Sequence, residues 1–139
     1  MEVITWLTHK YVMHGFLWYL HKDHHQPKYS SWFEKNDLFF LIFAIPSFLL
    51  IFFGIKQEFN LLFFTGLGIA LYGLCYFIVH DVIIHQRFHW FRNTNWRYLK
   101  ALRKGHKMHH KQLGKNGGES FGMLVVPWKY FKEKYSSFN

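Results

Sequence analysis

The sequence predicts an all-α integral membrane protein with a di-metal histidine site, and three observations carry this prediction. Two apolar runs, 38–55 and 59–79, contain no charged residue, and each is long enough to span a bilayer. Ten of the eleven histidines fall into two kinds of motif, each present twice. The formal net charge is +9, yet of the seventeen Lys and Arg residues only Lys56 lies between the apolar runs. The length of 139 residues predicts a single domain, 1–139.

Residues 3–20 are apolar enough for a membrane helix but include His9 and His14. Only eight residues precede His9. They cover about 12 Å of a hydrocarbon core that is ~30 Å thick. We therefore expect a partial N-terminal membrane helix, in which Glu2 would lie in lipid unless it faces protein or water.

The two apolar runs are expected to form a spanning helix hairpin, because only residues 56–58 separate them. So short a turn places the start of the first run and the end of the second on the same side of the membrane. This brings His80 level with the histidines of 21–25. Small residues that let a neighbouring backbone come close occur in the second run at Gly66, Gly68, Ala70 and Gly73.

Beyond Asp81, basic residues alternate with aromatic ones as far as Lys104, which predicts a pair of helices at the level of the lipid headgroups. By the positive-inside rule the basic ends, and the histidines with them, form a helical cap on the cytoplasmic side. A basic chain can also bind nucleic acid, but that class of protein has no use for two spanning runs. We therefore expect no nucleic-acid partner.

The first kind of motif, H-x-x-H-H, occurs at 21–25 and at 106–110. On a helix that turns about 100° per residue its three imidazoles project from one stripe, so each copy is expected to bind one metal ion. The second kind, H-x-x-x-x-H, occurs at 9–14 and at 80–85. Its two histidines stand about 140° apart on a regular helix, which suits either contact with two different ions or a distorted helix end.

Ten imidazoles exceed the four ligands of a tetrahedral ion or the six of an octahedral one, so the sequence predicts two metal ions. Imidazole nitrogen suits Fe, Zn, Cu or Ni, and the single cysteine, Cys75, is expected to pack inside its apolar run. His89 falls outside the repeated pattern and is not expected to be a ligand. The expected metal ligands are His9, His14, His21, His24, His25, His80, His85, His106, His109 and His110.

A carboxylate that accepts a proton from the second ring nitrogen commonly orients such a ligand. Asp81, next to His80, is the favoured candidate, because it directly follows an apolar run where an unpaired carboxylate would be costly. The alternative for Asp81 is an interfacial charge beside Arg87. Asp23, between two histidines of the first H-x-x-H-H, is the other candidate.

The segments around the histidines resemble those of a known family. They are HKYVMHG at 9–15, HKDHHQP at 21–27, EKNDLF at 34–39, YGLCYFIVHD at 72–81, IHQRF at 84–88, and GHKMHH with GKNGGESFGML at 105–124. Nearly the whole chain resembles the histidine-motif membrane di-iron oxygenases of the fatty acid hydroxylase and sterol desaturase superfamily, and most closely the bacterial β-carotene 3-hydroxylases. That family generally carries further apolar residues ahead of the segment matching 1–8. Either translation starts upstream or the first helix is a half-span.

The resemblance implies a non-haem di-iron monooxygenase, multi-pass in a bacterial inner (cytoplasmic) membrane, with the same ten histidines as ligands. It would use O2 and two electrons to hydroxylate C3 of the β-ionone ring, taking β-carotene through β-cryptoxanthin to zeaxanthin. The implied cofactors are two Fe ions. Zinc can replace iron in isolated protein, since zinc stands above Fe(II) in the affinity order. A carotenoid would arrive from the bilayer, whose core of ~30 Å matches its length.

Electrons must come from another protein, because the chain has no flavin or dinucleotide motif and no cysteine set for an iron–sulfur cluster. We expect a ferredoxin with an NAD(P)H-dependent reductase, docking on the basic stretch 87–111, which also attracts membrane lipid. Two alternatives remain open. One is a hydroxylase, ketolase or desaturase of another lipid, such as a fatty acyl chain or a sterol, and the other is a non-catalytic metal-binding membrane protein.

Overall fold

The computed structural model describes residues 1–26, 33–88 and 90–132, and the regular structure in these ranges is entirely helical. The N-terminal part comprises α1 (Glu2–Leu7), the π-helix η1 (Thr8–Phe16) and α2 (Trp18–His25). The 3-10 helix η2 (Lys35–Leu38) leads into α3 (Phe39–Lys56), which is followed by α4 (Leu61–Phe77). The remaining elements are the π-helix η3 (Ile78–Ile84), α5 (Arg97–His110) and α6 (Lys129–Lys132). The predicted all-α class is confirmed.

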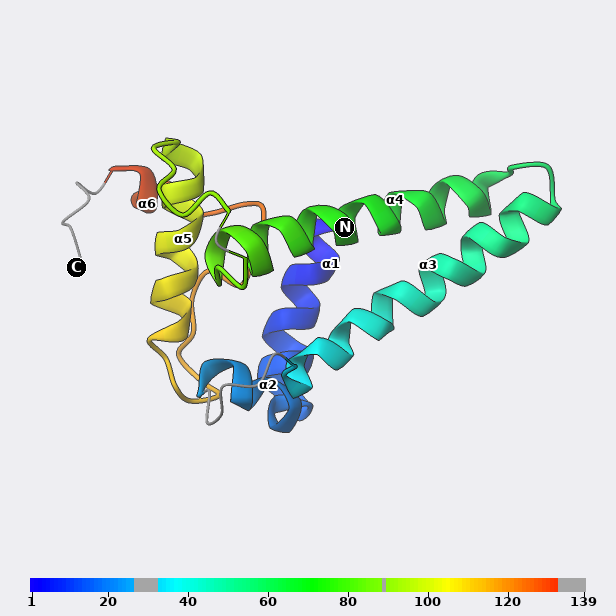
Figure 1. Cartoon of the computed structure of the whole chain (residues 1–139). Coiled ribbons are helices and arrows are strands. Elements are labelled where there is room, and N and C mark those ends of the chain that lie inside the picture. The colour runs from blue at the N-terminus through cyan, green and yellow to red at the C-terminus, as the bar shows by residue number, and fades with distance from the viewer. Residues whose placement is uncertain (27–32, 89, 133–139) are drawn as a thin grey trace.

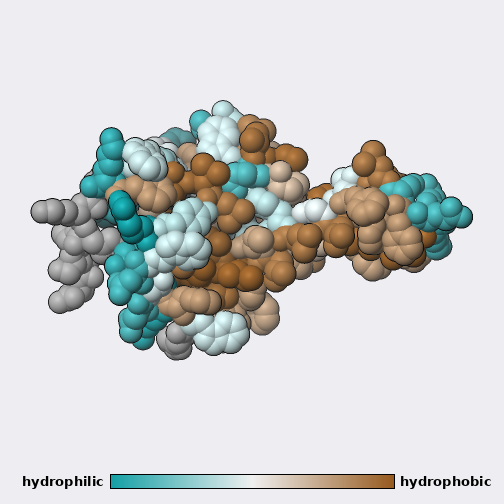
Figure 2. Space-filling view, turned by 90° about the horizontal axis from the view of Figure 1, so that it is seen from above, coloured by the Kyte–Doolittle hydropathy of each residue, from teal (hydrophilic) through white to brown (hydrophobic). Residues whose placement is uncertain are grey.

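Two stretches are long and apolar enough to cross a membrane, Lys35–Lys56 and Leu61–Ile84. They contain α3 and α4, which converge at the turn between them and spread apart toward the histidine-bearing helices (Figure 1). Figure 2 shows apolar side chains along these helices, with hydrophilic groups at the turn and at the opposite end of the molecule. An apolar band between two polar ends is the surface that a bilayer requires.

The close contact between α3 and α4 depends on two glycines. A Cβ on Gly54 would lie 2.2 Å from a backbone nitrogen of α4, and one on Gly66 would lie 2.8 Å from a backbone nitrogen of α3. The Ser47 hydroxyl donates a hydrogen bond of 2.8 Å to the Gly66 carbonyl. The expected close approach is therefore found at Gly66. A Cβ on Gly68 or Gly73 meets nothing within 4 Å in the described part of the chain, so these two glycines do not serve it.

The N-terminal segment 3–20 is not the single helix that its composition predicts. The backbone leaves the helical region at Gly15 (φ −98°, ψ −121°), and α2 begins three residues later at Trp18. The α1–η1 rod and α2 therefore run in different directions (Figure 1). Because of this break, the histidines of α2 lie beside those of η1.

The pair of helices expected after Asp81 is also replaced by a different arrangement. Only α5 forms, and the described residues of 85–96 make bends and turns, with Gln86 (φ 54°) and Phe91 (φ 57°) in the left-handed region. The Arg103 guanidinium donates to the carbonyls of Ile83, Phe91 and Arg92 at 2.8, 2.7 and 3.0 Å. A side chain of α5 thus satisfies backbone acceptors that a helix would otherwise have paired.

Segment 121–126 covers part of α5 and completes a small core. The buried side chains of this core are Val79, Ile83, Leu99, Leu102 and Met123. A Cβ on Gly105 would lie 2.7 Å from Val126, so α5 and the covering segment are in direct contact.

Glu2 ties three parts of the chain together. One carboxylate oxygen accepts hydrogen bonds from the backbone N–H groups of Met123, Leu124 and Val125 at 2.8, 3.0 and 3.0 Å. The other accepts from the Tyr72 hydroxyl of α4. Glu2 therefore faces protein rather than lipid, and it connects α1 to α4 and to the covering segment.

We expect Glu2→Ala to lower the free energy of unfolding by about 3 kcal/mol, because three backbone donors lose a charged acceptor. Glu2→Gln keeps an accepting oxygen and should lose less, so it serves as the matched control. Thermal melting of the purified protein in detergent measures both. An alanine variant that melts with the wild type would show that the carboxylate does not hold this junction.

Candidate metal centre

The histidines form two groups of ring nitrogens. Group one is defined by ring nitrogens that lie within 4.8 Å of one another in His9, His14, His21, His25 and His109. Group two is defined by the same criterion in His24, His85, His106 and His110. The His80 Nε2 atom lies 3.1 Å from that of His24, which adds His80 to group two. The structure thus brings together all ten expected ligand residues, while their role as ligands stays a prediction, and His89 lies outside the described residues.

Each H-x-x-x-x-H pair lies where a helix is widened to a π-turn. Backbone bonds that span five residues join Leu17 N to Val12 O at 3.0 Å, near the end of η1, and His85 N to His80 O at 2.8 Å, at the end of η3. In this geometry residues i and i+5 lie on nearly the same face of the helix. Both members of each pair consequently face the same group, so a distorted helix, not contact with two ions, explains this spacing.

Each H-x-x-H-H motif is divided between the groups, so the expectation that one copy binds one ion is wrong. His21 and His25 lie in group one and His24 in group two. In α5, His106 and His110, which are four residues apart, lie in group two, and His109 lies in group one. The physical reason is that the second and third histidines of the motif are consecutive residues, and consecutive residues point about 100° apart on a helix. The two groups are adjacent, with the rings of His25 and His110 stacked at 4.4 Å and 7°.

The Nδ1 atoms of group one all meet neutral oxygen acceptors. Four donate to backbone carbonyls: His9 to Phe121 (3.0 Å), His14 to Lys115 (3.1 Å), His25 to Gln112 (3.0 Å) and His109 to Glu119 (2.9 Å). The fifth, His21, donates to the side-chain oxygen of Asn36 at 2.6 Å. A carbonyl oxygen can only accept, so each of these Nδ1 atoms carries the proton and each Nε2 carries a lone pair.

Group one fits a metal ion on the chemistry of these donors. Its Nε2 atoms approach one another at 3.1 to 3.2 Å, with no proton to place between them. Converging lone pairs repel unless a cation lies among them. Ligands about 2.1 Å from one ion stand about 3 Å apart when they subtend a right angle, which agrees with the observed separations.

Group two also fits a bound cation, but a different observation indicates it. The Nε2 atoms of His85 and His106 lie 2.9 Å apart, and the buried Nε2 of His110 has no hydrogen-bond partner within the described ranges. A buried nitrogen without a partner is costly, and a bound cation would satisfy it. Both groups therefore fit metal binding.

Burial keeps these imidazoles neutral. It lowers the pKa of His25 to about 4, with a further contribution from His14. It lowers the pKa of both His109 and His110 to about 3, and the nearby His25 adds to this effect. Neutral imidazoles at pH 7 are the form that binds metal.

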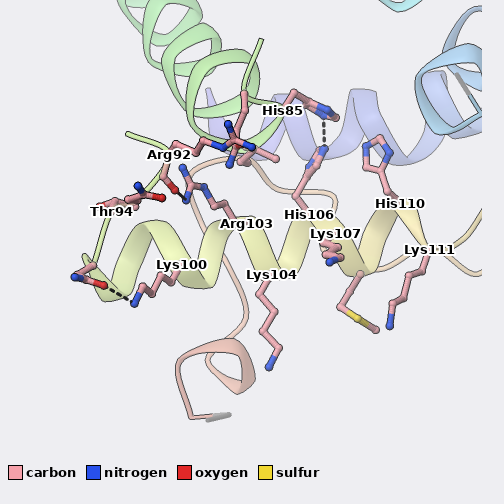
Figure 3. A pocket seen from close by; sticks show the side chains of 15 residues that line it. His85, Arg92, Thr94, Lys100, Arg103, Lys104, His106, Lys107, His110 and Lys111 are labelled. Carbon is pink, nitrogen blue, oxygen red and sulfur yellow. Dashed lines mark hydrogen bonds between the residues drawn. The ribbon is translucent and has the colours of Figure 1, made fainter. Parts of the chain in front are cut away.

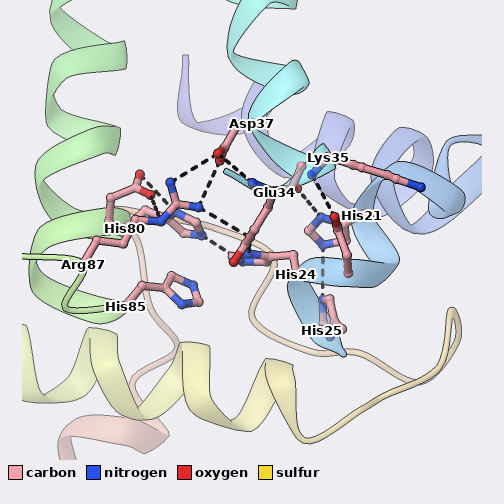
Figure 4. Close-up of polar contacts among 12 residues, drawn as sticks. His21, His24, His25, Glu34, Lys35, Asp37, His80, His85 and Arg87 are labelled. Carbon is pink, nitrogen blue, oxygen red and sulfur yellow. Dashed lines mark hydrogen bonds and ion pairs between the residues drawn. The ribbon is translucent and has the colours of Figure 1, made fainter. Parts of the chain in front are cut away.

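Carboxylates contact two histidines of group two (Figure 4). Asp81 Oδ2 lies 3.3 Å from His80 Nδ1, while its Oδ1 lies 3.1 Å from Arg87 Nε. Asp81 thus has both of the surroundings that sequence reasoning considered for it. Asp23, the other candidate, instead accepts from the Lys35 backbone N–H at 2.8 Å.

Sequence reasoning missed Glu34, whose Oε2 lies 2.6 Å from His24 Nδ1, and Asn36 beside His21. Both residues belong to the polar segment 34–37 just ahead of α3. Polar groups at that position could have been matched with the histidines that the hairpin brings level with them. The backbone acceptors of 112–121 carry no sequence signal of their own.

Aromatic rings wall off group one from water. The centroid of the Phe121 ring lies 5.5, 5.2 and 5.1 Å from the ring centroids of His9, His14 and His109. Trp18 lies 5.0 Å from the His14 ring. Group two is more accessible, because it borders a cleft of about 870 Å³ (Figure 3). This cleft is lined by His85, His106 and His110 and by the basic residues Arg92, Lys100, Arg103, Lys104, Lys107 and Lys111.

The fold and the site define an all-helical membrane protein built around a histidine-rich metal centre. The sequence profile described as fatty acid hydroxylase matches residues 1–132. The chain belongs to the fatty acid hydroxylase family and is a hydroxylating enzyme.

Named relatives resemble the chain along most of its length. It is 46% identical to a beta-carotene hydroxylase of Pantoea ananas, over 91% of this chain and 71% of that protein. It is 43% identical to a beta-carotene hydroxylase of Pseudescherichia vulneris, over 91% of this chain and 70% of that protein. It is 41% identical to the chloroplastic beta-carotene 3-hydroxylase of Haematococcus lacustris, over 91% of this chain and 40% of that protein. No solved structure matches the chain.

Acidification should destabilise the folded protein and release its metal. The folded-state pKa of His25 is about 4, below the unfolded value of about 6.5, so the unfolded chain binds protons first as the pH falls. Stability is complete above about pH 6.5 and should fall by about 2 kcal/mol for this one histidine by pH 5. Melting curves and bound metal measured from pH 8 to pH 5 test this, and a constant melting temperature across that range would contradict it.

Proposed function

We propose that this chain hydroxylates carotenoids at C3 of the β-ionone ring, converting β-carotene through β-cryptoxanthin to zeaxanthin at a di-iron centre. One observation carries the proposal: two five-histidine groups lie together in a chain that is 46% identical to a beta-carotene hydroxylase. All ten histidines would serve as ligands, with Asp81 orienting His80. Each of the two hydroxylations consumes one O2, two electrons and two protons, and it leaves one oxygen atom on carbon and the other in water.

The hairpin of α3 and α4 would span a bacterial inner membrane, with the histidine-bearing helices as a cap on the cytoplasmic side. The charge distribution supports this orientation, because Lys56 at the turn is the only basic residue between the two apolar runs. A carotenoid dissolved in the bilayer would reach the cap with its ring end, since the hydrocarbon core is ~30 Å thick and matches its length.

The chain's own groups would bind, orient and shield. Bound iron would supply O2 activation and the oxidation of the C3–H bond. The Nε2 lone pairs would hold the ions, while the carbonyls of 112–121 fix the rings of His9, His14, His25 and His109 by holding their Nδ1 protons. Phe121 and Trp18 exclude water from group one. No side-chain nucleophile is required.

A second candidate function is the hydroxylation of a fatty acyl chain, which the description of the family favours. Pigment and lipid extraction from cells that make β-carotene and express this chain separates the two. Zeaxanthin supports the carotenoid proposal, a hydroxylated fatty acid supports the second candidate, and unchanged lipids with bound metal would indicate a non-catalytic protein.

In the same cells His106→Ala, His109→Ala and His110→Ala should each abolish hydroxylation, because loss of a ligand removes the metal-dependent step. His89→Ala should retain most of it and is the matched histidine control. Chromatography of the pigments measures both. The ligand assignment is wrong if His89→Ala is as inactive as the other three.

Electrons would come from a ferredoxin, itself reduced by an NAD(P)H-dependent reductase, that docks at the basic cleft. This cleft borders group two directly. Arg103 is unsuitable for a charge-reversal test, because it holds three backbone carbonyls in place. Lys104 and Lys107 line the same cleft and are better targets.

Lys104→Glu combined with Lys107→Glu should slow ferredoxin-supported turnover about tenfold at low salt and less at high salt, because exposed charges are screened over about 10 Å at 0.1 M salt. Lys115→Glu, which reverses a charge outside the cleft lining, is the matched control. Turnover driven by a small chemical reductant and the metal content should not change. Unchanged ferredoxin-supported rates at low ionic strength would leave the basic stretch as a lipid anchor only.

A further inference from the structure

The two groups differ in the charge of the acceptors that hold their imidazole protons. In group one all five acceptors are neutral, four of them backbone carbonyls and the fifth the Asn36 amide. In group two His24 meets the Glu34 carboxylate at 2.6 Å, and His80 meets the Asp81 carboxylate at 3.3 Å. The repeated motifs are alike, but their surroundings are not.

Arg87 joins Glu34 and Asp81, the carboxylates that contact group two, into one network (Figure 4). Its guanidinium lies 3.5 Å from Glu34, 3.0 Å from Asp37 and 3.1 Å from Asp81. Three carboxylates and one guanidinium carry formal charges of −3 and +1, which leaves −2 beside group two. Arg87 therefore fixes the positions of Glu34 and Asp81 without neutralising them.

A carboxylate that accepts the Nδ1 proton makes the opposite nitrogen a stronger electron donor. A stronger donor binds a metal ion more tightly and stabilises its oxidised state. The lysines of the cleft act in the opposite direction, but dissolved salt screens charges at an exposed surface over about 10 Å at 0.1 M ionic strength. The carboxylates act through direct hydrogen bonds to the ligands, so their effect dominates.

We propose that Glu34 and Asp81, positioned by Arg87, make group two the metal position with the lower reduction potential and the tighter binding. This inference rests on the proposed di-iron centre. With iron bound, each group would hold one ion that takes up one electron as ferric iron becomes ferrous. Because group two borders the cleft, an electron from an external donor enters at the lower-potential ion and passes downhill to group one, through the adjacent rings of His25 and His110.

The test is a redox titration of the purified iron-loaded chain with a soluble chemical reductant, followed by iron spectroscopy. The wild type should show two one-electron steps. Glu34→Gln and, independently, Asp81→Asn should shift the lower step by at least a tenfold change in the ratio of oxidised to reduced iron, which is ~59 mV upward for one electron. Asn36→Asp, the matched control, places a carboxylate beside His21 and should shift the upper step downward.

A second readout uses zinc-loaded protein and a competing chelator. Glu34→Gln should weaken one of the two zinc ions about 10- to 100-fold and leave the other unchanged. Fewer than two ions per wild-type chain would overturn the di-metal function and this inference with it. Two ions with coincident potentials, or a single step that moves in both Glu34→Gln and Asn36→Asp, would overturn the inference alone.

Discussion

Neutral imidazole nitrogens cannot bond to one another once their other nitrogens carry the protons, and the rest of this structure depends on that constraint. Every Nδ1 of group one has an oxygen acceptor, so its Nε2 is a bare lone pair. The acceptors come from segment 112–121 and from η2, which is why irregular backbone is held so firmly against the helices. Glu2 holds residues 123–125, which follow this segment, and Arg103 holds the turns ahead of α5. The helices supply the histidines, and carbonyls of the irregular segment determine which ring nitrogen faces inward in His9, His14, His25 and His109.

Helix geometry distributes these histidines between the groups. A π-turn brings residues five apart onto one face, whereas an α-helix points the two consecutive histidines of H-x-x-H-H about 100° apart. Each half of the chain therefore gives four histidines to one group and one to the other. His24 crosses from the first half into group two, and His109 crosses from the second half into group one. The two groups are related as two copies of one arrangement that exchange a single ligand.

The sequence was sufficient for the helical class, the two apolar helices and the gathering of the ten histidines, because apolar length and repeated motifs are local signals. It left the meaning of H-x-x-x-x-H open, since a π-turn depends on backbone bonds that periodicity does not record. It assigned each H-x-x-H-H to a single ion, which is wrong. The spacing shows that three imidazoles share one side of a helix, but it does not show that different histidine groups lie beside the two edges of that side. Glu34 and Asn36 were missed since their contacts come from packing of η2 on α2, and the loop at 85–96 since it depends on Arg103.

The exchanged histidines make metal incorporation dependent on the whole chain. A nascent chain that has emerged only as far as α4 possesses neither complete group, because α5 carries His109 of group one and both His106 and His110 of group two. Neither group is complete until α5 has brought its histidines beside those of α2. Assembly of the candidate metal centre therefore coincides with tertiary closure rather than with synthesis, and a chain cut short after α4 would keep its two apolar helices without completing either histidine group.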